Sequence, residues 1–436
     1  MTFLYTIVDW KGEDLMKKLR IIFSLLFVAL LTTSCDLLQR LNSNSSQSQP
    51  SSISSTSPSI PSSSSSLQTS GDYLYPSIEE ELTVHFLDLN VSGDCILIDY
   101  GNYEILIDAG GNKSAGTNII VPYLNQYVED QCIELMIATH GHEDHIAGFV
   151  GLSNQASVLK DFSFGTIVDL GEGYENLNSS NELTALQKQY NELRDQKIEE
   201  GSQYYTIRDL YKENKTVWEI APQLTFSFLE TKFYNIPYTK HTQNLNNYSI
   251  ATQLKFEDKT FLFTGDLEEE GESSLLEMNQ LSKVNIFKAG HHGSNTASQE
   301  ALLEVIQPDI AIFTADSSKE STYNFPHPET IERLVPYTSQ FYTSYYNGHI
   351  QVKLLSSEKN IDIECSERKE LFSYVAYLNC YPTIQAIASI GSKITIESET
   401  KIENAESLYN RLTEDEKTYV YNYPTLLEAR EKFNQL

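Results

Sequence analysis

One short segment concentrates side chains that can bind metal ions. His140, His142, Asp144 and His145 lie within six positions, directly after the largely apolar run 132–138. In an extended chain alternate side chains point to the same side, so His140, His142 and Asp144 should face one way, and a turn at Asp144 lets His145 approach from another angle. Imidazole and carboxylate are ligands for zinc, manganese or iron, whereas calcium prefers oxygen alone. The spacing therefore predicts two neighbouring metal sites.

Asp266 ends a second segment that favours metal binding. It follows two predicted strands, 250–256 and 260–263, so its carboxylate is expected at a strand end, where it can face a metal ion. Gly265 precedes it, and a residue without a side chain lets the loop approach the ions closely. Gly-Asp is also a common turn sequence, so the pair alone does not indicate a metal site. The prediction depends on its place among the other motifs.

Adjacent histidines form a third segment. His291 and His292 follow the predicted strand 286–289. Because neighbouring side chains point in different directions, we expect one histidine to bind metal and the other to face substrate. We assign the metal to His292, and the opposite assignment stays open. The backbone amides near Gly293 and Ser294 are expected to contact an anionic group of the substrate.

Read together, these segments resemble a known family. The loop His-x-His-x-Asp-His is similar to the signature of the metallo-β-lactamase superfamily. The stretches FLDLNVSGDCILI, ILIDAGG, KAGHHGSNTAS and NFPHPET follow one another as in the hydrolase domain of ComEC-type competence proteins. The resemblance implies an α/β fold, a four-layer αβ/βα metallo-β-lactamase sandwich, over residues 80–357.

The resemblance also implies roles for individual residues. Asp266 matches the ligand that bridges two metal ions, and His327, in the histidine-proline pair of NFPHPET, is a candidate general acid beside the site. Many members place a third histidine where this chain has Asn246 and Asn247, so the first metal site is poorer in ligands. Both asparagines, with Ser294, are candidate substrate contacts.

The implied mechanism is hydrolysis with two divalent ions, zinc or manganese, that share an activated hydroxide. No nucleotide cofactor is implied. The expected metal ligands are His140, His142, Asp144, His145, Asp266 and His292. The expected catalytic residues are Asp144, His291 and His327.

Composition favours a folded, acidic protein. Of its 436 residues, 40% are hydrophobic, which is enough to build a core, and the formal net charge is -29. Such a surface repels anionic polymers, so any contact with nucleic acid or a cell-wall polymer must be local. Two phosphodiester substrates stay open, nucleic acid and phosphocholine or teichoic-acid polymers. A surface binding protein without turnover is the third hypothesis, because the third histidine is absent. The sequence does not indicate an oligomeric state.

Residues 1–35 resemble a bacterial lipoprotein signal peptide. A basic segment precedes the apolar run 21–31, which is too short to span a bilayer and ends shortly before Cys35. The resemblance implies a lipid on Cys35 and a position on the extracellular face of the cell membrane, with plain secretion or an uncleaved anchor as alternatives. Met16 is the expected start. Residues 36–75 are rich in serine, above all between 42 and 71, and predict a disordered tether.

The remaining segments predict elements around the hydrolase domain. The insertion 171–215 contains an amphipathic helix, either a lid over the site or a solvated surface helix. The tail 372–436 predicts a short strand at 384–391 and then helices, which together form a small, mainly helical module. Cys365 and Cys380 flank a short segment and are candidates for a disulfide.

Overall fold

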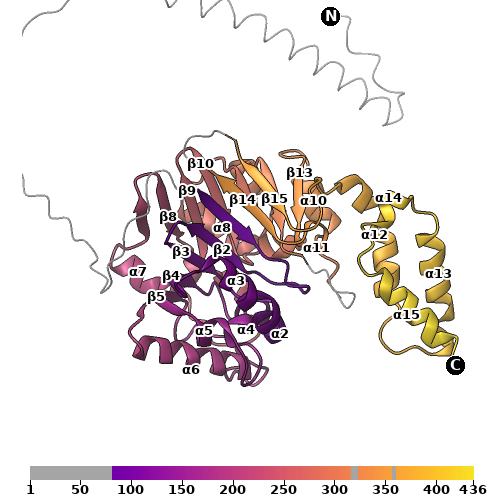
Figure 1. The fold of residues 1–436 in the computed structure, drawn as a ribbon, viewed down its shortest axis with the longest axis horizontal. Helices are drawn as coiled ribbons and strands as arrows, with labels where there is room; N and C mark the ends of the chain where they lie inside the picture. Colours follow the sequence, from indigo (N-terminus) through magenta and orange to yellow (C-terminus); the bar gives the residue numbers. More distant parts are fainter. Residues whose placement is uncertain (1–80, 316–322, 356–359) are drawn as a thin grey trace, which may run out of the picture. The chain divides into compact units, whose positions relative to one another are not determined.

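A computed structural model describes residues 81–315, 323–355 and 360–436. Two β-sheets form the centre of this part of the chain, and helices cover their outer faces (Figure 1). The predicted signal peptide, its Cys35 and the serine-rich tether lie outside the described residues. Within the described ranges, every helix is too short or too polar to cross a membrane.

The first sheet has eight strands and delivers the histidine loop to its edge. Its order is β15-β14-β1-β2-β3-β4-β5-β6, with parallel pairing from β3 to β6 and antiparallel pairing elsewhere. The strands are β1 Leu82–Phe86, β2 Ile96–Tyr100, β3 Glu104–Ile107, β4 Cys132–Ile137, β5 Ser163–Asp169, β6 Gln203–Thr206, β14 Ile350–Leu354 and β15 Asp362–Cys365.

The second sheet has seven strands and delivers Asp266 and the histidine pair. Its order is β13-β12-β11-β10-β9-β8-β7, with parallel pairing from β10 to β13. The strands are β7 Val217–Ala221, β8 Leu224–Leu229, β9 Ala251–Phe256, β10 Lys259–Phe263, β11 Ile286–Lys288, β12 Ile310–Phe313 and β13 Gln340–Thr343.

Helices complete the outer layers and the loops. Those beside the first sheet are α2 Lys113–Ala115, η1 Gly116–Ile120, α3 Val121–Tyr127, α4 Glu143–Val150, α5 Val158–Asp161, α6 Ala185–Glu199 and α7 Ile207–Lys212. The later ones are η2 Lys232–Asn235, η3 Leu245–Tyr248, α8 Glu269–Met278, η4 Gly290–Gly293, α9 Glu300–Ile306, α10 Pro328–Leu334, α11 Ser344–Asn347, α12 Tyr374–Ala388, η5 Ile396–Ser398, α13 Glu399–Tyr409, α14 Glu414–Lys417 and α15 Tyr423–Phe433.

Three hydrophobic clusters show that the layers follow from strand alternation. In β3, Ile105 and Ile107 belong to the cluster between the two sheets, whereas Leu106 belongs to the cluster beneath α3, α4 and α6. In β10, Phe263 points between the sheets and Leu262 belongs to the cluster that includes α8 and α9. Residues on alternating faces are thus buried on both sides, as expected for sheets covered by helices. The predicted four-layer sandwich is confirmed.

The tail differs from the prediction in one element. Residues 384–391, predicted as a strand, continue α12 and the turn after it. Tyr377, Cys380, Ile384 and Ile387 are buried at spacings of three and four, which is the helical period and outweighs the β-branched content. The helices α12, α13 and α15 share one hydrophobic cluster with the second sheet.

The predicted disulfide is wrong. Cys365 and Cys380 are both free thiols, Cys365 in β15 and Cys380 in α12. The Cys380 thiol donates to the carbonyl oxygen of Ala376 at 3.0 Å, one turn earlier in the same helix. Packing of α12 therefore determines where this thiol lies, and the short distance along the sequence does not.

Candidate metal centre

The histidine loop leaves β4 and turns into a helix. His140 follows the strand end, His142 is the N-cap of α4, and Asp144 and His145 lie in the first turn of that helix. The sequence predicted an extended segment with a turn at Asp144, whereas the helix begins one residue earlier, at Glu143. The helical turn brings His145 inward, where it is fully buried.

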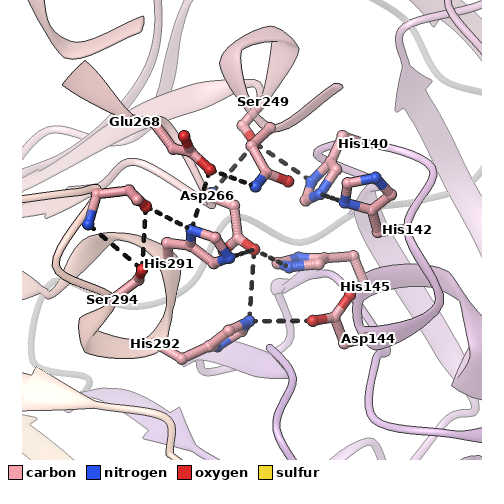
Figure 2. Close-up of polar contacts among 12 residues, drawn as sticks. His140, His142, Asp144, His145, Ser249, Asp266, Glu268, His291, His292 and Ser294 are labelled. Carbon is pink, nitrogen blue, oxygen red and sulfur yellow. Dashed lines mark hydrogen bonds and ion pairs between the residues drawn. The ribbon is translucent and has the colours of Figure 1, made fainter. Parts of the chain in front are cut away.

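Four side chains from three segments converge on one point (Figure 2). Asp144, His145, Asp266 and His292 each offer a ligand atom, and these atoms all lie within 4.8 Å of one another. The Asp266 carboxylate Oδ2 is 3.1 Å from His145 Nε2 and 3.5 Å from His292 Nε2. The chain thus gathers two imidazoles and two carboxylates, a ligand set that suits zinc or manganese.

Orphaned atoms at this point fit a bound metal ion. Among the described residues, His145 Nε2, His292 Nε2 and Asp266 Oδ1 are buried and make no well-aligned hydrogen bond, although both nitrogens lie within ion-pair distance of Asp266 Oδ2. A buried polar atom without a partner costs free energy, so such atoms are rare unless an ion or water satisfies them. Three of them in one ligand cluster therefore match a metal site.

His140 and His142 lie next to this cluster. Nε2 of His140 and Nδ1 of His142 face each other at 3.0 Å, and the His140 ring lies 4.2 Å from the His145 ring, centroid to centroid. Nδ1 of His140 is 3.2 Å from the Ser249 hydroxyl, which fixes the ring (Figure 2). Nε2 of His140 and Nδ1 of His142 are placed to hold a second ion. That site would have fewer ligands than the first cluster.

The histidine pair adopts a backbone conformation that separates its two rings. His291 and His292 have φ angles of 48° and 54°, in the left-handed region that is uncommon for residues with side chains. His292 is fully buried in the ligand cluster, whereas the His291 side chain is 20% exposed, with Nε2 3.7 Å from Asp266 Oδ2. This arrangement agrees with His292 as the metal ligand and His291 as the residue at the open edge.

Two buried carboxylates orient the metal-binding rings, and the sequence interpretation missed both. Asp108, after β3, accepts from His145 Nδ1 at 2.7 Å. Asp94 lies 3.2 Å from His292 Nδ1 and 2.5 Å from Lys288 Nζ. A carboxylate on Nδ1 leaves Nε2 available for the metal. The available signal for Asp108 is its place directly after an apolar strand. Asp94 follows a glycine, and Gly-Asp is typical of a turn, so the sequence offers no signal for it.

Burial and neighbouring charges shift the pKa values of the histidines in and beside the cluster. Burial opposes the charged form of His145, but Asp266 and Asp108 outweigh burial and raise the pKa of His145 well above its ordinary value. Asp266 and Asp94 act on His292 in the same way. Burial, with the nearby His145 and His142, instead lowers the pKa of His140, so its ring is neutral and ready to bind metal. A bound cation would take the place of the protons on His145 and His292.

The predicted substrate contacts have structural partners. Asn247 Oδ1 accepts from the backbone N–H groups of Glu268 and Gly271 at 3.1 and 3.0 Å, at the start of α8. Asn246 donates to the Glu268 carboxylate at 2.8 Å. Ser294 Oγ lies 3.0 Å from the Thr296 hydroxyl. Glu268 also lies 3.4 Å from His291 Nδ1 and helps to orient that ring (Figure 2).

His327 lies next to the histidine pair, where its backbone N–H donates to the carbonyl oxygen of Gly293 at 2.9 Å. Its Nδ1 accepts from the backbone N–H of Asn295 at 3.0 Å, and its Nε2 faces the carbonyl oxygen of Tyr323 at 2.9 Å. Both ring nitrogens are therefore engaged by backbone groups, and the structure does not bring this ring into the ligand cluster. A role for His327 as general acid stays a prediction.

The insertion supports the histidine loop from the side. Asn176 donates to the carbonyl oxygen of Gly141 at 3.0 Å, and its own backbone N–H donates to Gln187 in α6. Gln187 and Tyr190 are buried against the loop and α4. A Cβ on Gly141 would lie 2.3 Å from Gln187 Oε1, so a larger residue there would displace the Gln187 side chain from its place against the loop. The helix is thus a packed wall beside the metal centre.

Comparison with known proteins agrees with this geometry. Residues 90–161 and 179–314 match the family model described as the metallo-beta-lactamase superfamily. The chain contains a metallo-β-lactamase superfamily domain. This domain includes the histidine loop, Asp266 and the histidine pair, so the predicted resemblance is confirmed.

The relatives of this metallo-β-lactamase domain include competence proteins. ComE operon protein 3 of Bacillus subtilis (strain 168) is 22% identical over 298 residues, which are 64% of this chain and 34% of that protein. Recombination protein 2 of Haemophilus influenzae is 26% identical over 276 residues, 62% of this chain and 28% of that protein. A diphosphatase of the PhnP family aligns with a TM-score of 0.34 and 13% identity, over 65% of this chain and 100% of that one. The chain spans about a third of the length of ComE operon protein 3 and of recombination protein 2.

Proposed function

We propose that the protein is a metal-dependent phosphodiesterase that acts on nucleic acid. The observation that supports this proposal is the cluster of Asp144, His145, Asp266 and His292, whose ligand atoms lie within 4.8 Å and include buried nitrogens that make no well-aligned hydrogen bond. His140 and His142 extend the cluster toward a second ion. The similarity to competence proteins favours nucleic acid as the substrate.

The residues in and around the cluster would have different roles in hydrolysis. Asp108 and Asp94 hold the rings of His145 and His292 so that Nε2 faces the ions. Divalent ions bound there would polarise the phosphodiester and lower the pKa of bound water. His291, oriented by Glu268, lies at the open edge, where its Nε2 is placed to hydrogen-bond a phosphate oxygen or the leaving oxygen.

A second substrate class is supported by charge. The formal net charge of -29 disfavours long polyanions, so a phosphocholine diester on a cell-wall polymer such as teichoic acid, whose ammonium group offsets the phosphate charge at the site, suits this surface. We further propose that the protein is held at the extracellular face of the membrane through Cys35. Metabolic labelling with a fatty acid tests this anchoring, and loss of the label in a Cys35→Ser variant is the expected result.

Hydrolysis of bis-p-nitrophenyl phosphate tests the proposed activity. The purified protein is assayed with zinc or manganese beside Asp266→Ala and the surface control Asp258→Ala, whose side chain is 76% exposed. We expect metal-dependent turnover that is lost in Asp266→Ala and kept in Asp258→Ala. Absence of turnover in the folded wild type with either metal would refute the phosphodiesterase and favour a binding protein.

A further inference from the structure

An exposed aromatic ring lies at the edge of the metal centre. Tyr323 is 63% exposed, and its ring stacks on Phe325 with centroids 5.4 Å apart and an interplanar angle of 12°. Phe325 is buried, and its centroid lies 5.8 Å from that of His291 and 6.1 Å from that of His292. One aromatic ring therefore separates Tyr323 from the site histidines, and the second face of Tyr323 is open to solvent.

Hydrogen bonds fix the backbone that carries this ring, and stacking on Phe325 orients the ring itself. The carbonyl oxygen of Tyr323 faces His327 Nε2 at 2.9 Å, and His327 is itself fixed by the backbone of Asn295. The hydroxyl of Tyr377, in α12, donates to the carbonyl oxygen of Pro326 at 2.7 Å. A ring that is already positioned loses little conformational freedom when a ligand binds. The exposed tyrosine thus has the properties of a preformed contact surface.

We propose that Tyr323 is a stacking platform for a nucleobase of the substrate, next to the phosphodiester at the metal centre. The inference rests on the proposed function and specifies its substrate. Bases stack on exposed aromatic rings irrespective of sequence, and stacking needs no positive charge. Such affinity matters for a protein with a formal net charge of -29, in which 60 acidic residues outnumber 31 basic ones.

The geometry favours a base over a choline group. A quaternary ammonium group is bound by several aromatic faces that surround it. Tyr323 presents a single face, because Phe325 covers the other one. A flat ring continues the stack of Tyr323 and Phe325, whereas a rounded ammonium group would contact only one ring.

Two esters that differ only in the nucleoside test the platform. They are thymidine 5′-(p-nitrophenyl phosphate) and methyl p-nitrophenyl phosphate, which share the leaving group and the charge. The wild type is compared with Tyr323→Ala and with Tyr323→Phe, which keeps the ring. The quantity measured is the ratio of kcat/KM for the nucleotide ester to kcat/KM for the methyl ester. p-Nitrophenylphosphorylcholine is the third substrate.

We expect Tyr323→Ala to lower this ratio about 5-fold to 150-fold, mainly through KM of the nucleotide ester, because stacking contributes about 1–3 kcal/mol per base. Tyr323→Phe should keep the ratio within about 2-fold, since stacking does not need the hydroxyl. An unchanged ratio in Tyr323→Ala, or an equal loss for both esters, would overturn the inference. A selective loss with the choline ester would overturn it in favour of an ammonium site.

The assay separates this inference from the proposed function. If the wild type hydrolyses both esters and the ratio does not depend on Tyr323, only the platform is refuted. If the folded wild type hydrolyses none of the esters with zinc or manganese, the phosphodiesterase itself is refuted, and the platform with it.

Discussion

The carboxylate of Asp108 determines how His145 presents its metal-binding nitrogen. It accepts from the backbone N–H and the hydroxyl of Thr139 and from His145 Nδ1, each at 2.7 Å. Asp108 and His145 are completely buried, so water cannot replace a lost acceptor. Because Nδ1 donates its proton to Asp108, Nε2 is left for the metal.

An Asp108→Asn variant tests this role. An asparagine side chain has one acceptor oxygen for three donors, so its NH₂ group must face either Thr139 or His145. Loss of an outer carboxylate on a metal-binding histidine typically lowers metal affinity about 10-fold to 100-fold, which corresponds to about 1.4–2.7 kcal/mol. We expect a loss in this range for Asp108→Asn.

The pH of the assay matters, because two effects oppose each other. Asp108 also raises the pKa of His145, and a proton on that ring competes with the metal. Removing the carboxylate weakens this competition below the raised pKa. The full loss of affinity is therefore expected at high pH, and a smaller loss at low pH.

Competition with a chromogenic chelator measures the affinity. Metal-free wild type, Asp108→Asn and the surface control Asp258→Asn are titrated with zinc at several pH values between about 6 and 9. Asp258→Asn should match the wild type. If Asp108→Asn binds zinc within about 2-fold of the wild type at the highest pH, the reasoning about ring orientation is refuted.

Three further outcomes are expected. Chelation of the metal should lower Tm in differential scanning fluorimetry, because an ion present at about 100 times Kd stabilises the fold by about 2.7 kcal/mol, and an unchanged Tm would contradict a bound ion. In urea unfolding, Tyr377→Phe should lower the free energy of unfolding by about 1 kcal/mol, because the hydrogen bond to Pro326 is lost. The matched control is Tyr381→Phe, and an equal loss in both variants would contradict a stabilising role of that bond. Burial, and after it the neighbouring Glu134, raises the pKa of Glu104 from 4.5 to about 10. Between these two pH values the folded state keeps a proton that the unfolded chain releases, so the free energy of unfolding falls as the pH rises. Glu104→Gln should therefore exceed the wild type by about 1–3 kcal/mol at pH 9 and by less at pH 5, whereas parallel stability curves would contradict the raised pKa.

The ligand residues were predictable because their types and spacing are unusual. His140, His142, Asp144 and His145 follow a buried strand, and the structure places them near one another. Their grouping differs from the prediction, because the first turn of α4 joins Asp144 to His145 and leaves His140 beside His142. Asp266 and His292 also reach the cluster, because parallel strands bring their carboxyl ends to one edge of a sheet.

The supporting residues were not predictable from local pattern. Asp94 contacts Lys288 and the Thr314 hydroxyl, which lie far along the chain on the second sheet, and nothing near Gly93-Asp94 indicates these partners. The same limit explains the end of α12 at 384–388, where a strand was predicted. Its apolar run is compatible with a strand or a buried helix, and tertiary packing decides between them.

Anomalous X-ray diffraction from crystals grown with zinc or manganese tests the central claim most directly. Data collected on both sides of the metal absorption edge locate the ion without assumptions about activity. We predict an anomalous peak within bonding distance of Asp144, His145 Nε2, Asp266 and His292 Nε2, where the free protein gathers its ligand atoms. A protein that crystallises with these side chains ordered and no anomalous peak among them would contradict the assignment of a metal centre.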